Sequence, residues 1–381
     1  MVSQVAIRPD TLFSETEKQY MFITGSEAVK EAIRRANVDI AVAYPITPQS
    51  ESMHLVGDLY AQGCIREYFR GENELAVMSE VAGASMGGVR VFTATGGPGT
   101  LRAFEMFSAW SGARLPIVCA FMTRGLNAPL TIQPDNIEMA HMLDTGMIIL
   151  HAENAQDLYD MILRAFMVAE MPDVHIPVGV FADGFFVTHT RDRVQVDAGE
   201  VKLPAYNPYN APVPVIDMEN VPVRLMRDPF VMKSNFISYA THASWQQEIL
   251  AAAERSRRYL NNHLGGLIDV YHAGAEIMVL ASGTAVSQGR DAIDRARSEG
   301  IDVGLIKLKC LRPFPFDEIN EALRTVKAVI IPEFNRVGWL FREIKTALQF
   351  QVKVIGAPRV FGGMTMPVEL ILDEIRRCHN D

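Results

Sequence analysis

Four short segments of the chain combine polar or charged residues with a place at the end of an apolar run or the start of a helix. Their sequences are YPITPQS (44–50), ENE (72–74), ATGGPGT (94–100) and MTRGLNAP (122–129). Ligands of open α/β sheets bind outside the carboxyl ends of the strands. We therefore expect these segments to meet at one edge of a sheet and to form a binding site.

Thr47 stands between two prolines, Pro45 and Pro48. Each proline ring fixes its own backbone and biases the residue before it towards an extended conformation, so the threonine hydroxyl is held in one place. One interpretation is a stiff strand-to-helix turn in which Thr47 caps the helix. The other is a hydroxyl aimed at a ligand, and the residue types alone leave both open.

Arg124 and Glu74 are the two charged candidates. Arg124 follows an apolar run and could bind a carboxylate with two hydrogen bonds, although a surface ion pair fits the same position. Glu74 stands at a predicted helix start, where a carboxylate is commonly only a favourable partner of the helix dipole. Position alone does not decide between these roles.

Two glycine motifs fit well-known enzyme classes poorly. In the loop 96–99, Arg102 stands where the dinucleotide fingerprint needs a third glycine and Pro98 removes one amide. A tight turn is therefore favoured over a phosphate cradle, and a nicotinamide dehydrogenase is disfavoured. The segment 83–87 (GASMG) matches a nucleophile elbow, but it follows a helical pattern where that motif needs a strand, so a serine hydrolase is disfavoured as well.

Composition narrows the choice further. The 381 residues carry 36 basic and 45 acidic side chains, a net charge of −9, which argues against a surface that binds nucleic acid or an anionic membrane. The N-terminus has no signal-peptide core, and no apolar run reaches the roughly 20 residues of a membrane span. Four cysteines without a C-x-x-C predict no metal or cluster site in this chain and reduced thiols in a cytoplasmic protein.

The apolar pattern predicts two α/β units. Strands are expected at 39–44, 90–95, 116–122 and 176–182, with helices from 49 and at 73–87, 100–112 and 155–169. This alternation predicts a parallel sheet covered on both faces. A Pro-rich connector follows, then a helix opened by a Ser244–Gln247 capping box, and a second α/β unit from 275. We predict domains at 1–195 and 267–381, with a connector and helix at 196–266.

The order of these segments resembles the alpha subunit of 2-oxoacid:ferredoxin oxidoreductases, especially the pyruvate enzymes. The quoted 44–50 segment, ENELAVMSEVAGASMGGVRVFTAT and TRGLNAP carry the resemblance in the first unit. In the second unit AEIMVLASGTAVSQGRDAI, LKCLRPFPFDEI and PEFNRVGWLFREI resemble the C-terminal domain of transketolases. The resemblance implies a doubly wound thiamine-diphosphate-binding domain of the pyrimidine type, followed by a transketolase C-terminal-like α/β domain.

The family's chemistry is the oxidative decarboxylation of a 2-oxo acid with coenzyme A, which yields acyl-CoA and CO2. A beta subunit is expected to hold the diphosphate and Mg²⁺ through a G-D-G motif that this chain lacks. Electrons are expected to pass to [4Fe–4S] clusters on partner subunits, among them gamma and ferredoxin-like delta subunits. The chain should be inactive without these partners.

Site roles follow from the resemblance. Glu74 matches the glutamate that bonds the aminopyrimidine ring of the cofactor and favours its imino tautomer. Thr47, with Tyr44, Pro45 and Ile46 of the same motif, is expected to contact cofactor and substrate. Arg124 matches the arginine that binds the substrate carboxylate.

One segment departs from the pyruvate pattern. Pyruvate-type members usually read N-R-A-L-S-A-P-I-N-I-W, whereas this chain reads T-R-G-L-N-A-P-L-T-I-Q, so that Gln133 replaces a tryptophan and Gly125 and Asn127 also differ. Loss of the aromatic ring predicts a larger pocket and an aryl 2-oxo acid such as phenylglyoxylate as substrate. The alternatives are pyruvate, if a neighbouring residue compensates, or a non-catalytic scaffold subunit.

Overall fold

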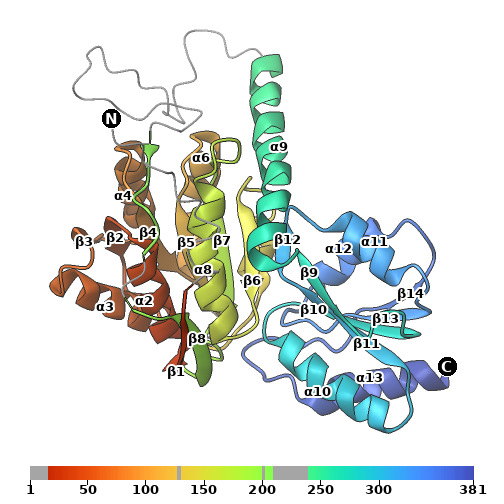
Figure 1. The fold of residues 1–381 in the computed structure, drawn as a ribbon. Helices are drawn as coiled ribbons and strands as arrows, with labels where there is room; N and C mark the ends of the chain where they lie inside the picture. The colour runs from red at the N-terminus through yellow and green to blue at the C-terminus, as the bar shows by residue number, and fades with distance from the viewer. Residues whose placement is uncertain (1–15, 127–129, 200–201, 209–238) are drawn as a thin grey trace.

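The computed structural model describes residues 16–126, 130–199, 202–208 and 239–381. Two sheets lie side by side, a larger one built mainly from the first half of the chain and a smaller one from the second half (Figure 1). A long helix, α9 (Tyr239–Leu264), stands between them. No helix in the described ranges is both long enough and apolar enough to cross a membrane.

The larger sheet has seven strands in the order β12-β6-β7-β5-β4-β2-β3. Their bounds are β2 (Ile40–Ala43), β3 (Glu67–Arg70), β4 (Val91–Thr95), β5 (Val118–Thr123), β6 (Ile148–Ala152), β7 (Val178–Asp183) and β12 (Cys310–Arg312). All neighbours pair in parallel except β12, which pairs antiparallel with β6. A separate two-stranded ribbon, β1 (Lys18–Thr24) with β8 (Arg191–Asp197), was not predicted.

Helices cover both faces of this sheet. They are α2 (Gly25–Ala36), α3 (Ser50–Ala61), α4 (Glu74–Met86), α5 (Pro98–Arg102), α6 (Phe104–Gly112), α7 (Ile137–Met142) and α8 (Ala155–Ala169). Side chains of a strand alternate between faces. Phe92 accordingly packs in the core with α2, α3 and α8, and its neighbour Val91 packs in the opposite core with α4 and α6. Because the sheet is buried on both faces, its strands are apolar throughout. This arrangement confirms the predicted doubly wound fold.

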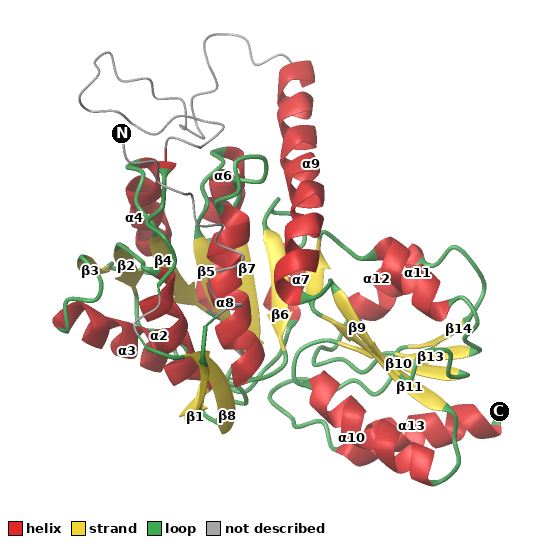
Figure 2. Cartoon of the chain, viewed as in Figure 1, coloured by secondary structure: helices red, strands yellow, loops and turns green. Residues whose placement is uncertain are grey.

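The smaller sheet has five strands in the order β14-β13-β10-β11-β9. They are β9 (Ile268–Tyr271), β10 (Ile277–Ala281), β11 (Val303–Leu308), β13 (Ala328–Ile330) and β14 (Lys353–Ile355), and β9 runs antiparallel to β11. Helices α10 (Ala285–Ser298) and α13 (Val368–Asn380) cover one face, while α11 (Phe316–Leu323) and α12 (Trp339–Ala347) cover the other (Figure 2). This unit matches the predicted second α/β unit.

One predicted helix start is wrong. Helix α9 begins at Tyr239, before Ser244, so the Ser244–Gln247 pair does not open it. The pattern S-x-x-Q therefore lies inside a helix that had already begun. Most of the Pro-rich connector, 209–238, lies outside the described residues.

Strand pairing crosses the predicted domain limits. β12 lies in the segment predicted as the C-terminal domain, yet it forms an edge of the larger sheet. Helix α9 packs on the first unit, since Arg164 Nε donates to the carbonyl oxygen of His263 across 3.0 Å and Arg255 Nε to that of Asp173 across 2.7 Å. The division at 195 and 266 stays a prediction.

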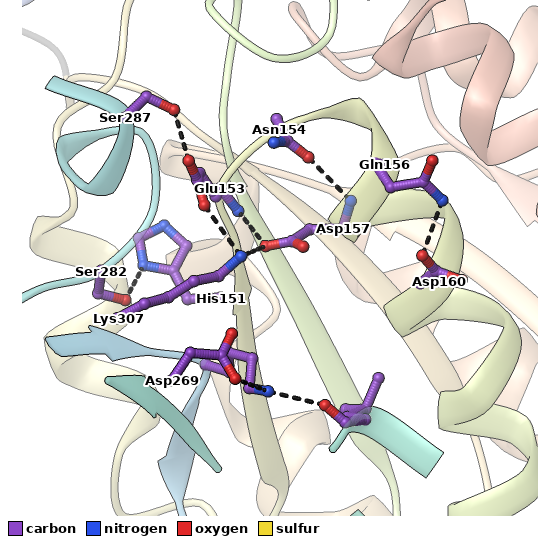
Figure 3. A network of polar contacts seen from close by, with 12 residues as sticks. His151, Glu153, Asn154, Gln156, Asp157, Asp160, Asp269, Ser282, Ser287 and Lys307 are labelled. Atoms are coloured by element: carbon purple, nitrogen blue, oxygen red, sulfur yellow. Dashed lines mark hydrogen bonds and ion pairs between the residues drawn. The ribbon is translucent and has the colours of Figure 1, made fainter. Parts of the chain in front are cut away.

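A buried polar network joins the two sheets (Figure 3). Glu153, just after β6, accepts hydrogen bonds from Ser287 Oγ at 2.6 Å and Arg290 Nη1 at 2.7 Å. The Lys307 ammonium on β11 lies 2.9 Å from Glu153 Oε2 and 2.7 Å from Asp157 Oδ2. Because Glu153 and Lys307 are both buried, neither charge tolerates the loss of the other, and the network holds the two units in one arrangement.

A second contact between the sheets involves His151 and Asp183, at the ends of β6 and β7. His151 Nδ1 lies 2.6 Å from Ser282 Oγ, and Asp183 Oδ2 accepts from the amide and hydroxyl of Thr284 at 2.7 and 2.6 Å. Gly283 has a positive φ of 63°, and a Cβ atom there would collide with His151 and Asp183. The glycine lets the turn after β10 approach the larger sheet.

Candidate active site

The predicted segments meet at the carboxyl ends of β2, β4 and β5, beside the start of α4. Arg124, just after β5, donates from Nη1 to the backbone carbonyl oxygen of Thr47 across 3.0 Å. A Cβ atom on Gly97, just after β4, would lie 2.5 Å from Cγ of Arg124. The arginine side chain thus crosses the glycine turn and reaches the loop that follows β2.

Arg124 is only 8% exposed, and its Nε has no hydrogen-bond partner among the described residues. Burial lowers the pKa of its guanidinium from the usual value, while the nearby carboxyls of Glu138 and Glu74 oppose this shift. The group stays charged at neutral pH. It therefore offers a cation with an unused donor, which is what recognition of a carboxylate requires.

Glu74 is the first residue of α4, whose N-cap Asn73 accepts from the amide of Ala76 at 3.1 Å. The Glu74 side chain is buried against the glycine turn, because a Cβ atom on Gly99 would lie 2.8 Å from its Oε1. Its Oε2 has no hydrogen-bond partner within the described part of the chain, although Arg102 Nε lies 3.8 Å from it. The helix start therefore presents a buried carboxylate oxygen that is not used by the fold.

Several more buried polar atoms lack partners in this region of the described chain. They are Oγ1 of Thr95, Oγ1 of Thr100 and Oε2 of Glu138. Buried polar atoms of folded proteins are nearly always hydrogen-bonded. Together with Oε2 of Glu74 and Nε of Arg124, they indicate a place where a polar ligand completes the structure.

Glu138, the second residue of α7, is the main participant that the sequence did not reveal. It is fully buried, and its Oε1 accepts hydrogen bonds from the amides of Gly97 and Arg124, each at 3.0 Å. Burial raises its pKa to about 8. The only available signal was one acidic residue in the apolar run IEMAHM.

The loop after β2 presents Thr47 at the surface. Thr47 and Pro45 are exposed, whereas Tyr44 and Ile46 are half-buried. The loop is braced by Gln49, whose Nε2 donates to the carbonyl oxygen of Tyr44 across 2.6 Å. The N-cap position of α3 is Gln49, so the interpretation of Thr47 as a helix cap is wrong.

Gly125 and Gln133 face each other across the loop that departs from the pyruvate pattern. The amide of Gly125 donates to the carbonyl oxygen of Gln133 across 3.1 Å. The Gln133 side chain accepts a hydrogen bond from the hydroxyl of Thr131. Asn127, the third differing position, lies outside the described residues.

The second unit supports this loop from its outer side. A Cβ atom on Gly363 would collide with Thr131, and the amide of Gly362 donates to Asp135 Oδ2 across 3.1 Å. Asn136 is held at both backbone groups: its amide donates to the carbonyl oxygen of Phe334 at 2.7 Å, and its carbonyl oxygen accepts from Trp339 Nε1 at 3.2 Å. The conformation of this loop therefore depends on both units.

Glu333 and Asn335 explain how Trp339 is positioned. The buried Glu333 carboxylate accepts from the amides of Leu340 and Phe341 at 2.8 and 3.0 Å, and Asn335 Oδ1 accepts from that of Gly338 at 2.6 Å. These bonds satisfy donors at the start of α12. The segment EFNR thus has a structural role in this chain.

The two glycine motifs form the structures that the sequence favoured, a tight turn at 96–99 and part of a helix at 83–87. Gly97 gives its amide to Glu138, so the turn 96–99 serves packing and does not leave that amide for a phosphate. Ser85 is buried in the last turn of α4 rather than on a strand-to-helix elbow. Within the described ranges, no group of three or more His, Cys, Asp or Glu side chains could hold a metal ion.

Residues 31–255, more than half of the chain, match the family described as "Pyruvate flavodoxin/ferredoxin oxidoreductase, thiamine diP-bdg". The chain belongs to this family. Residues 275–371 match "Pyruvate:ferredoxin oxidoreductase core domain II". Both halves of the predicted fold class are thereby confirmed.

Curated relatives carry names of enzyme subunits. The "Pyruvate synthase subunit PorA" of Methanothermobacter thermautotrophicus is 32% identical over 94% of this chain and 95% of its own length. The "Ketoisovalerate oxidoreductase subunit VorA" of Pyrococcus abyssi is 29% identical over 86% of this chain and 84% of its own length. The predicted identity, an alpha subunit of a 2-oxoacid:ferredoxin oxidoreductase, is confirmed.

Two solved structures share the fold. The 2-oxoglutarate:ferredoxin oxidoreductase from Magnetococcus marinus, solved with 2-oxoglutarate, coenzyme A and succinyl-CoA, gives a TM-score of 0.77 at 19% identity; it matches 94% of this chain, which spans 65% of that chain. A split gene transketolase, described as an inactive beta4 tetramer, gives a TM-score of 0.57 at 12% identity over 94% of this chain and 99% of its own. The transketolase-like character of the fold agrees with the sequence prediction.

Proposed function

We propose that this alpha subunit supplies half of a thiamine-diphosphate site at which a 2-oxo acid is decarboxylated oxidatively and its acyl group is transferred to coenzyme A. The observation that carries the proposal is the joint burial of Glu74, at the start of α4, and Arg124, just after β5, each with a polar atom that the described fold leaves without a partner. A scaffold subunit has no use for such a pair, because each buried partnerless group costs stability.

The residues present fit the pyrimidine half of the cofactor. A buried carboxylate oxygen such as Oε2 of Glu74 is the acceptor that an aminopyrimidine needs. The diphosphate with its Mg²⁺ is assigned to a beta subunit, because the Gly97 amide is already bound to Glu138. Gamma and ferredoxin-like delta subunits with [4Fe–4S] clusters complete the proposed enzyme.

Each residue of this chain then has a stated task. Thiamine diphosphate supplies, when bound, the nucleophilic carbon and the electron sink for decarboxylation. Glu74 would hold the pyrimidine ring through its unpaired Oε2 and so support acid–base exchange by the ring. Arg124 binds the substrate carboxylate through its unused donor, and the Thr47 loop, to which it is bonded, orients the keto group.

The proposed substrate is an aryl 2-oxo acid such as phenylglyoxylate. Gln133 replaces a tryptophan beside Arg124, and its side chain is turned towards Thr131, so the volume of an aromatic ring is freed for the substrate. Relatives named for ketoisovalerate as well as pyruvate support a pocket that varies in size within the family. Pyruvate is the second candidate, favoured by the 32% identity to a pyruvate synthase subunit.

The test is turnover of the purified complex on phenylglyoxylate, pyruvate, ketoisovalerate and 2-oxoglutarate, with coenzyme A and a viologen dye as electron acceptor. We expect the highest kcat/KM for phenylglyoxylate and no turnover by the alpha subunit alone. A preference for pyruvate would overturn the aryl assignment only. Failure on every 2-oxo acid after addition of thiamine diphosphate and Mg²⁺ would overturn the proposal as a whole.

A further inference from the structure

We propose that Glu138 is a positioning residue, which holds Arg124 in place for the substrate carboxylate and so sets the affinity for the 2-oxo acid. The inference deepens the proposed function and rests on the carboxylate-binding role assigned to Arg124. Glu138 itself is not assigned contact with the substrate.

The first argument is geometric. One oxygen of Glu138 accepts the amides of Gly97 and Arg124, each at 3.0 Å. These amides follow β4 and β5, which are neighbours in the sheet. Beyond the last paired residues of the two strands, Thr95 and Phe121, the two segments continue into different loops. A single carboxyl therefore fixes the spacing of the two loops at the point where the site begins.

The second argument is the path of the arginine side chain. Atoms Cγ and Nε of Arg124 occupy the space above Gly97, at 2.5 and 3.0 Å from where a Cβ atom would stand. Its Nη1 then reaches the carbonyl oxygen of Thr47. If the glycine turn moves relative to β5, the guanidinium must move with it, because the side chain lies directly on the turn.

The third argument concerns charge. Glu138 is fully buried, and burial raises its pKa to about 8; the amides of Arg124 and Gly97 oppose this shift, while the nearby Asp135 adds to it. At pH 7 the carboxyl of Glu138 is therefore mostly neutral and does not pair with the guanidinium of Arg124. The positive charge of Arg124 then interacts with Glu74 and with the substrate anion. When Glu138 ionises, it competes with the substrate for the same cation.

The experiment compares Glu138→Gln and Glu138→Ala with the wild type in the assembled complex. KM for the 2-oxo acid and kcat are measured from pH 6 to 9, with thermal unfolding as a check on folding. Glu105→Gln, an exposed carboxyl on α6, is the matched control. Glutamine keeps the oxygen that accepts both amides but cannot ionise, whereas alanine removes the acceptor.

We expect the wild-type KM to rise as the pH passes about 8 and that of Glu138→Gln to stay near the neutral wild-type value over the whole range. Glu138→Ala should raise KM about tenfold at pH 7, because the amides of Gly97 and Arg124 lose their shared acceptor and Arg124 is no longer held in place, with a smaller change in kcat. A purely structural role would lower the unfolding temperature and leave the pH profile of KM unchanged.

The outcomes distinguish this inference from the proposed function on which it rests. Wild-type turnover, with the same alkaline rise of KM in Glu138→Gln as in the wild type, overturns the role of Glu138 and leaves the proposed function intact. The Gln variant decides the matter even if the Ala variant does not fold. A wild-type complex that is inactive on every 2-oxo acid overturns both.

Discussion

The guanidinium of Arg124 is hydrogen-bonded to the main chain of Thr47, with 3.0 Å between Nη1 and the carbonyl oxygen. The two residues follow β5 and β2, which are not neighbours, because β4 lies between them in the sheet. The arginine spans this gap above Gly97. The ends of three strands are thereby coupled, and a change at one of them is expected to be felt at the others.

Replacement of Glu74 by Gln should lower the turnover of the assembled complex by roughly 10²–10⁴-fold, the usual size of an acid–base contribution. The unfolding temperature should hardly change, because Oε2 of Glu74 has no hydrogen-bond partner among the described residues. Viologen reduction and thermal unfolding measure the two quantities. Glu72→Gln, at an exposed neighbour, is the control, and full turnover in Glu74→Gln would favour a scaffold subunit.

Replacement of Arg124 by Lys should raise KM for the 2-oxo acid by about 10–100-fold, because an ammonium lacks the planar set of donors with which a guanidinium binds Thr47 and a carboxylate at once. Lysine also cannot maintain the same span to the Thr47 loop. Steady-state kinetics of the complex provide the measurement. Arg66→Lys is the control, since Arg66 has a side chain that is 78% exposed; equal KM values for both variants would contradict the assignment.

Gly97→Ala and Gly63→Ala form a matched pair. Both glycines have positive φ, 53° and 72°, so an alanine strains the backbone at either position. A Cβ atom on Gly97 meets Arg124, whereas one on Gly63 meets nothing within 4 Å. We expect both to lower the unfolding temperature and only Gly97→Ala to raise KM. A normal KM in Gly97→Ala would show that the arginine does not depend on the turn.

Gln133→Trp should shift selectivity from phenylglyoxylate towards pyruvate, because the indole would occupy the space that we assign to the aryl group. The change should be at least tenfold in the ratio of the two kcat/KM values, which corresponds to roughly 1.4 kcal/mol. Gln351→Trp, at an exposed position of the second unit, controls for the added ring. An unchanged ratio would mean that Gln133 does not line the substrate pocket.

Glu153→Gln should destabilise the chain by about 3 kcal/mol, because it leaves the buried Lys307 without its full counter-charge. Burial alone raises the pKa of Glu153, but Arg290 and Lys307 outweigh this effect and hold it below the ordinary 4.5. The stabilisation is therefore present above pH 4.5 and is lost as the pH falls through the lower pKa of the folded state.

Denaturant titrations of both proteins at pH 7 and below pH 4.5 measure the difference. We expect the gap between wild type and Glu153→Gln to narrow on acidification. Glu170→Gln is not a suitable comparison, because Glu170 pairs with Arg90 inside the first unit. Glu254→Gln, on a mostly exposed carboxylate, should change little at either pH.

Strands β2, β4, β5 and β7 could be predicted because burial of a strand on both faces produces a continuous apolar run in the sequence. Strand β6 is equally buried but was not predicted. The ribbon of β1 and β8 could not, since Tyr20 and Phe22 are exposed and the partner strand lies far along the chain. The start of α9 was misplaced for a related reason: a local S-x-x-Q pattern says nothing of where a helix has already begun.

The site could be predicted in part, because strand ends of a parallel sheet must converge, and Glu74, Thr47 and Arg124 were placed there by that logic together with the resemblance. The role of Glu138 could not be predicted, because Glu138 binds main-chain amides, and no residue type in the sequence indicates such partners. The surroundings of Gln133 were equally hidden, because they depend on Gly363 in the second unit.

The short strand β12 closes one edge of the larger sheet although it comes from the second half of the chain. In a hybrid protein that joins the first half of one relative to the second half of another, the edge strand β12 would come from a different relative than the rest of the larger sheet. Its register with β6 would then have to match, or the edge would stand open to aggregation. Recombination between relatives is thus constrained at the three residues of β12.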